Sequence, residues 1–144
     1  MSTSVREQIL VGLLARARTA YSIARRDVPQ YNDNDLPRMI LWEGAELNDT
    51  TQYGFDNLSL VVIIDFAIAV NPDTTVSTLA NTILANIIDA LQIDTDKTMS
   101  GLISSIRYRN SNVDYPEPGR GVLGVRVTFD VGYQIRRGNP YANN

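Results

Sequence analysis

The stretch from Leu58 to Val70 constrains the fold of this chain more than any other feature. Apolar residues alternate along all of it, and every second side chain falls on one face of an extended strand. A slip of one residue would exchange the two faces, so we expect a firmly set register in a sheet covered on its apolar side. Residues 122–136 alternate in the same way and predict a second long strand.

Two segments have helical periodicity instead. In residues 4–18, Val5, Ile9 and Leu13 recur at four-residue spacing, and Ser2, Thr3 or Ser4 can supply the N-cap. Residues 75–92 place apolar side chains at i, i+3, i+4 and i+7, which predicts an amphipathic helix facing the core. We expect Asp73 or Thr74 to cap this helix. The arginines of the first segment lie off its apolar stripe and are expected on a solvated face: Arg6, Arg16 and Arg18.

Shorter strands are predicted at residues 39–43 and 102–110, with a break at residues 48–51 and loops at residues 25–35 and 112–120. The element order is then α, β, β, α, β, β. The economical arrangement is α+β: a mostly antiparallel (mixed) β-sheet with two amphipathic α-helices packed on one face. We expect one domain over residues 1–144, with an irregular tail at residues 137–144.

The chain has no cysteine and no histidine. Thiol nucleophiles, disulfides, thiolate zinc sites and imidazole acid–base chemistry are therefore excluded within one chain. We expect no enzymatic activity, no cofactor and no metal. No apolar run approaches the ~20 residues that span a bilayer, and residues 1–8 lack a signal-peptide pattern. The net charge of −3 lacks the basic excess of a nucleic-acid-binding domain.

Two aspartates are the candidate catalytic groups. Asp65 and Asp130 both fall on polar strand faces, so neighbouring strands could form a carboxylate pair for acid–base chemistry. The favoured interpretation is that each pairs across strands with Arg107, Arg109 or Arg126. Such arginines would hold both acids ionised, whereas a general acid needs a raised pKa.

Arginine and tyrosine in the two long loops are candidate anchors for a partner protein, because both residue types are enriched at interface hot spots. Plain solvated loops are an equally good interpretation of any one of them. These residues are Arg25, Arg26, Tyr31, Tyr115 and Arg120.

Three stretches resemble the tail terminator proteins of long-tailed bacteriophages, the family of the lambda-like tail terminator. Residues 35–46 lead through an acid, an apolar residue and Pro37 into a strand with an acidic, glycine-containing end. Residues 58–70 run through Asn71–Pro72–Asp73 into the helix at 75–92. Residues 102–133 form a hairpin that ends in Val-Thr-Phe-Asp-Val-Gly-Tyr. Family chains usually stop near a similar tyrosine, whereas this chain continues through residues 134–144.

The resemblance implies a virion protein, assembled in the host cytoplasm as a homo-hexameric ring. The ring would cap the tail tube protein, end its polymerisation and dock the head–tail connector or head-completion protein, with a sheath protein as a further partner in a contractile tail. DNA would pass through the lumen without specific binding, and no membrane is involved. We assign to the subunit interface or lumen Asp65, Arg107, Arg109, Arg126 and Asp130, and to tube or connector docking the five loop residues.

Three other interpretations remain open. The first is another phage neck protein, such as a head-completion or connector component, because these share small sheet-plus-helix designs and ring symmetry. The second is a small carboxylate-dependent hydrolase, which would need a concave pocket around Asp65 and Asp130 without arginine partners. The third is a cellular adaptor domain.

Overall fold

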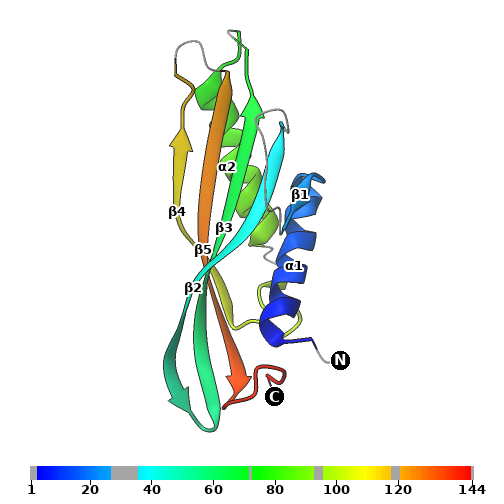
Figure 1. Ribbon diagram of the computed structural model, residues 1–144, viewed down its shortest axis with the longest axis vertical. Coiled ribbons are helices and arrows are strands. Elements are labelled where there is room, and N and C mark those ends of the chain that lie inside the picture. The colour runs from blue at the N-terminus through cyan, green and yellow to red at the C-terminus, as the bar shows by residue number, and fades with distance from the viewer. Residues whose placement is uncertain (1–2, 27–35, 72, 93–95, 118–120, 144) are drawn as a thin grey trace.

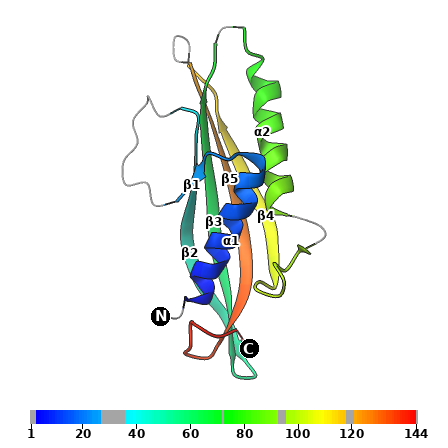
Figure 2. The same cartoon turned by 90° about the vertical axis from the view of Figure 1, so that its right-hand side faces the viewer.

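The computed structural model describes residues 3–26, 36–71, 73–92, 96–117 and 121–143. Its elements follow in the order α1 (Val5–Ala20), β1 (Ala24–Arg25), β2 (Arg38–Gln52), β3 (Phe55–Ala69), α2 (Val76–Leu91), β4 (Ser105–Asp114) and β5 (Val122–Arg136). The sheet order is β1-β2-β3-β5-β4; β1 and β2 are parallel, and the other three neighbouring pairs are antiparallel. Both helices cover one face of this sheet (Figures 1 and 2). The predicted α+β class is therefore confirmed.

The core lies between the sheet and the helices. Alternate residues of β3 and β5 are fully buried and face each other across the two strands, as Leu60 does with Val131 and Ile64 with Val127. Helix α1 contributes Ile9 and α2 contributes Ile87, both inaccessible to solvent. Burial of each such side chain contributes roughly 1.5–3 kcal/mol, so this one face of β3 and β5 holds the layers together.

The hairpin of β2 and β3 is longer than predicted. Strand β2 continues to Gln52 through residues 48–51, where the sequence predicted a break. The turn is formed by Tyr53 and Gly54 with φ of 53° and 81°, the positive values that a two-residue type I′ hairpin turn needs. Beyond Glu43 both faces of β2 are largely exposed, so no alternation marks this strand in the sequence.

Several boundaries and caps differ from expectation. Ser4 caps α1 by accepting a hydrogen bond from the Glu7 backbone N–H, as predicted. The N-cap of α2 is Thr75, which makes no side-chain capping bond, and not Asp73 or Thr74 as predicted. The Thr74 hydroxyl donates to the Asn71 side chain. Strand β4 begins at residue 105 and includes residues 112–114, which were predicted as loop. No helix among the described residues is long and apolar enough to span a membrane.

Arg16 is buried, contrary to the predicted solvated position. Its guanidinium donates to the carbonyl oxygen of Leu91 at 2.8 Å and to that of Asp96, and so joins α1 to the end of α2. The prediction failed because this side of α1 packs against the segment that follows α2. Arg18 is exposed as predicted.

The irregular C-terminal segment is tied to the rest of the fold. The Arg137 N–H donates to the Gly54 carbonyl at 2.8 Å, at the turn of the β2–β3 hairpin. The Val5 N–H, in the first turn of α1, donates to the Pro140 carbonyl at 2.9 Å. The tail therefore braces the hairpin turn and the start of α1 at one end of the molecule (Figure 1).

Candidate interaction surface

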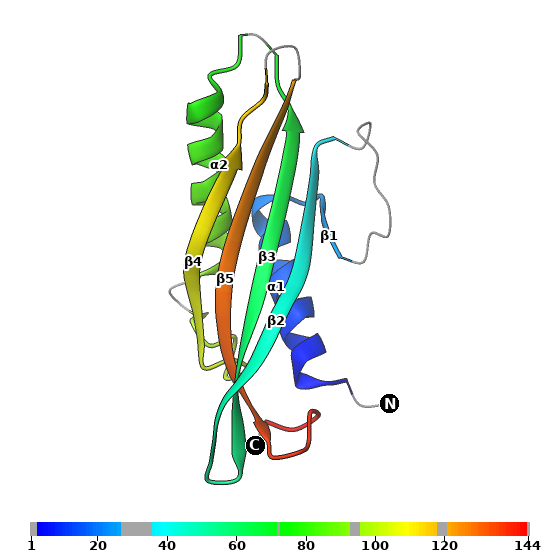
Figure 3. The ribbon, with the colours of Figure 1, turned by 60° about the vertical axis from the view of Figure 1, so that its left-hand side comes forward.

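The sheet face opposite the helices carries the predicted charged residues and is not covered by either helix (Figure 3). We call it the open face. Asp65 of β3 lies directly opposite Arg126 of β5, and the guanidinium donates to both carboxylate oxygens at 2.7 and 3.1 Å. Both side chains are partly exposed. The geometry is bidentate, the arrangement that best fixes an arginine against a carboxylate.

Asp130 has two arginine neighbours on the same face. Arg107 lies opposite it in the β4–β5 register at 3.9 Å, and Arg109 lies at 3.7 Å. Because Asp130 and Arg126 are four residues apart on β5, the two ion-pair groups are about 13 Å apart along the strand at 3.3 Å per residue. Asp65 and Asp130 therefore do not form a carboxylate pair, and each is paired with arginine as the favoured interpretation predicted.

An apolar row lies between the two ion-pair groups. Trp42 of β2, Ile63 of β3 and Thr128 of β5 are direct neighbours across the strands, and Thr128 is only 8% exposed. Tryptophan and arginine are both enriched at the centres of protein interfaces, and the open face carries both. The sequence placed Trp42 in a strand, but its position beside Ile63 depends on the β2–β3 register, which periodicity alone does not give.

The predicted docking residues do not form one patch. Arg25 is exposed on β1 and Tyr115 is 55% exposed after β4, and these strands are opposite edges of the sheet. Arg26 donates two hydrogen bonds, at 2.8 and 3.0 Å, to the Glu7 carboxylate of α1 and lowers the pKa of that carboxyl. Arg26 is thus held against α1 by these bonds. The other two predictions, Tyr31 and Arg120, lie outside the described residues.

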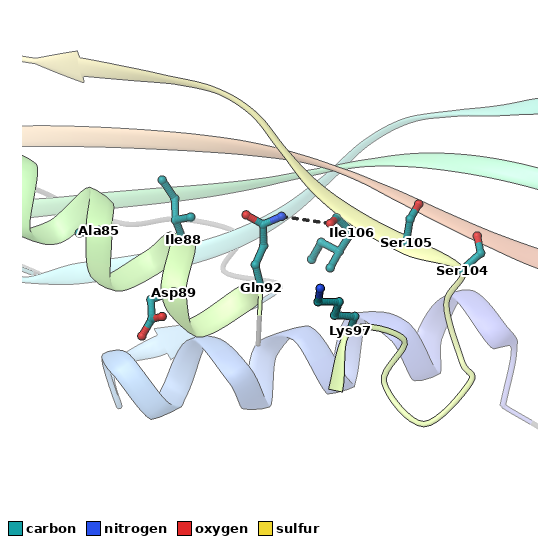
Figure 4. Close-up of a pocket in the computed structure, with 8 residues that line it drawn as sticks. All are labelled: Ala85, Ile88, Asp89, Gln92, Lys97, Ser104, Ser105 and Ile106. Carbon is teal, nitrogen blue, oxygen red and sulfur yellow. Dashed lines mark hydrogen bonds between the residues drawn. The ribbon is translucent and has the colours of Figure 1, made fainter. Parts of the chain in front are cut away.

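Two further surface features escaped the sequence analysis. Tyr53, at the tip of the β2–β3 hairpin, is 91% exposed. A hollow of about 660 Å³ lies between α2 and β4 (Figure 4), lined by Ala85, Ile88, Asp89, Gln92, Lys97, Ser104, Ser105 and Ile106. The turn dipeptide Tyr53–Gly54 was the available signal for the first feature, whereas the hollow depends on how α2 lies against β4. Among the described residues, no group of three potential metal ligands comes together.

No protein-family model matches this sequence, and no curated protein matches it either. The resemblance to tail terminators therefore depends on the three quoted stretches and on the order of the elements. The observed α+β fold agrees with the fold predicted from periodicity and element order. A fold of this kind hosts many functions, so the function has to be argued from the surface itself.

Proposed function

We propose that this protein is a structural component of a bacteriophage tail that assembles as a hexameric ring, caps the tail tube and receives the head connector. The observation that carries the proposal is the open face, where arginines are paired with aspartates of the same chain. We place this face toward the lumen of the ring. The resemblance supplies the family, and the face supplies the physical argument.

A conduit for DNA has to avoid holding phosphates. Protein–DNA affinity rises steeply with the number of phosphates that Lys and Arg neutralise, and ring symmetry multiplies each basic residue by the number of copies. On the open face the bidentate contact with Asp65 occupies Arg126, and Asp130 lies between Arg107 and Arg109. These ion pairs within one chain lower the positive charge of the proposed lumen wall, and so they favour passage of DNA over its binding.

The two ends of the elongated sheet suit two different partners. One end carries the β2–β3 hairpin and the C-terminal segment, with Tyr141 exposed. The other carries the ends of β4 and the start of β5, with Tyr115 and Val122 exposed. Exposed tyrosines supply large contact area with a polar handle, which is typical of protein anchors. In the proposed ring one end contacts the tube protein and the other contacts the connector.

The first test is the oligomeric state. Native mass spectrometry and negative-stain images of the purified protein should show closed six-fold rings. A protein that remains a single copy at every concentration would contradict the proposal. Phage particles that lack this chain should carry overlong tail tubes, whereas tails of normal length that fail to join heads would identify a neck component instead.

The second test addresses the lumen. Asp130→Asn removes the carboxylate beside Arg107 and Arg109, so the ring should retain double-stranded DNA more strongly at low salt, with a steep loss of retention as salt rises. The matched control is Asp73→Asn, which changes the net charge equally at an exposed position between β3 and α2. Filter binding at two salt concentrations measures the difference. Equal retention by both variants would show that the open face does not line the channel.

A further inference from the structure

We infer that Tyr53 of one copy inserts into the hollow between α2 and β4 of the next copy, and that this contact closes the ring. The inference rests on the proposed function, because the ring supplies the neighbouring copy. It goes further in naming the two surfaces that meet. We call them the Tyr53 tip, which is the β2–β3 turn at Tyr53–Gly54, and the α2–β4 hollow.

The Tyr53 tip presents a bulky side chain where the backbone disfavours one. Tyr53 has φ of 53°, and the first position of a type I′ turn is usually Asn, Asp or Gly because other side chains crowd the backbone there. Tyr53 is 91% exposed, so contacts within the chain do little to offset that cost. A large aromatic group in such a position points to a contact outside the chain.

The arm behind the tip is held in place before binding. The Asn57 amide donates to the Thr50 hydroxyl at 2.9 Å across the two strands. The Gln134 side chain of β5 donates to the side-chain oxygen Oδ1 of Asn57 at 2.7 Å. The tail adds the bond from Arg137 to Gly54. An arm that is already ordered loses little conformational entropy on docking, which favours affinity.

The α2–β4 hollow suits a phenol. Ile88 and Ile106 give it a partly buried apolar floor, and Gln92 bridges the two elements by donating from Nε2 to the Ile106 carbonyl at 3.1 Å (Figure 4). Asp89 and Lys97 are exposed at its rim. An apolar floor can accept the aromatic ring while the polar rim accepts or donates to the hydroxyl. A volume of about 660 Å³ is ample for one tyrosine side chain.

The charges of the two sheet edges favour contact between unlike edges. Beyond Trp42, the charged residues of β2 are all acidic: Glu43, Glu46 and Asp49. Arg6 of α1 pairs with Glu43 and Glu46 and offsets part of this charge. Near the start of β4, Arg107 and Arg109 share the single carboxylate of Asp130, and at the hollow Asp89 offsets Lys97, so this part of the β4 side has a small net positive charge. The positively charged residues near the tip belong to β5 and to the C-terminal segment of the chain, on the β3 side of the hairpin. The outer edge of β2 therefore stays acidic. Opposite potentials steer the arm of one copy toward the β4 side of another and disfavour contact between two arms.

Tip and hollow are different surfaces of one chain, so a contact between them can be heterologous. Heterologous contacts generate rings when the rotation between copies closes. The Tyr53 tip lies at one end of the sheet and the hollow lies beside β4 (Figures 1 and 4). A tilted subunit can bring its tip to the level of its neighbour's hollow.

The first experiment uses Tyr53→Asn. Asparagine suits the turn better than tyrosine, so at a concentration where both proteins are monomeric the variant should unfold at the same temperature as wild type or higher. Assembly of the variant should need at least about tenfold more protein, a factor that corresponds to 1.4 kcal/mol. The matched control, Tyr115→Asn, removes an exposed tyrosine at the other end and should assemble normally. Native mass spectrometry across a concentration series measures both. If Tyr53→Asn forms rings as readily as wild type, the inference is overturned. This holds even if those rings no longer bind tail tubes, because Tyr53 would then contact the tube and not the neighbouring subunit.

The second experiment is a cross-link. The chain has no cysteine, so Tyr53→Cys and Ala85→Cys can be mixed as two single-cysteine proteins under a mild oxidant. A disulfide-linked heterodimer should form, whereas Tyr53→Cys mixed with Val11→Cys, on the exposed side of α1, should give none. Assembled rings without the 53–85 link would refute this contact and leave the proposed function standing. If the link forms but the protein assembles only to a dimer, the claim that this contact closes a ring is wrong. If the protein never assembles, both proposals are wrong.

Discussion

Arg16→Met tests the contact that joins the two helices. Arg16 is 7% exposed, and its guanidinium donates to the carbonyl oxygens of Leu91, the last residue of α2, and of Asp96 beyond it. Methionine keeps an unbranched apolar stem and has nearly the same helix propensity as arginine. The substitution therefore removes the donors and leaves the helix and most of the packing in place.

The magnitude follows from these bonds. A hydrogen bond from a charged donor contributes about 1.5–3 kcal/mol, and the substitution removes two. Relief of the desolvation of a buried guanidinium offsets part of this loss. The ion pair with the Asp96 carboxylate, at 3.5 Å, adds little because that side chain is 47% exposed. We expect a net loss of about 3 kcal/mol in the free energy of unfolding, or roughly 10 °C in Tm for a chain of this length.

Urea unfolding followed by circular dichroism, at a concentration where the protein is monomeric, measures this loss. The control is Arg18→Met on the same helix, where an exposed guanidinium donates one hydrogen bond to the Ala24 carbonyl at 3.0 Å. Its removal should lower the free energy of unfolding by about 0.5–1 kcal/mol. The reasoning is refuted if Arg16→Met costs no more than Arg18→Met.

Two further substitutions probe the ends of the sheet. Burial, and then the hydrogen bond that its hydroxyl donates to Glu46, raise the pKa of Tyr133 above the usual value of about 10, so the folded state should lose stability as pH rises above 10. Tyr133→Phe lacks this loss, and urea midpoints of the two proteins should converge between pH 8 and pH 11; a constant difference would contradict the assignment. In Gly121→Ala the new Cβ would lie 2.7 Å from the Val70 carbonyl oxygen, and the shift would break the 2.7 Å bond from the Val70 N–H to the Gly121 carbonyl. We expect a loss of about 1–2 kcal/mol in urea unfolding, and an unchanged midpoint would show that the backbone there yields freely.

Sequence periodicity predicted the elements whose two faces differ. Strand β5 was predicted at its observed bounds, and α2 within a residue at each end, because each has one apolar face that packs into the core. The outer half of β2 was missed because neither of its faces is buried, so only pairing with β3 identifies it. Arg16 was misplaced because periodicity locates a residue on its helix without saying what packs against that position.

The candidate site was predictable in kind and not in detail. The sequence favoured arginine partners for Asp65 and Asp130, and the structure confirms such partners for both. Which arginine meets which aspartate depends on the order β3-β5-β4 and on register, and both are long-range properties. The apolar row at Trp42 depends on the same register.

The ion pairs of the open face have little value to an isolated subunit. Exposed pairs of this kind contribute about 0–1 kcal/mol, and the contacts of Asp130 at 3.7 and 3.9 Å are loose. Asp130→Asn should therefore leave the fold intact, so any gain in DNA retention would come from the charge of the face and not from unfolding. In a ring the same small change is repeated in every subunit around one channel, where the effects on phosphate binding combine. In the proposed ring, pairs that matter little for folding would decide whether DNA passes, so the single substitution Asp130→Asn tests the lumen assignment.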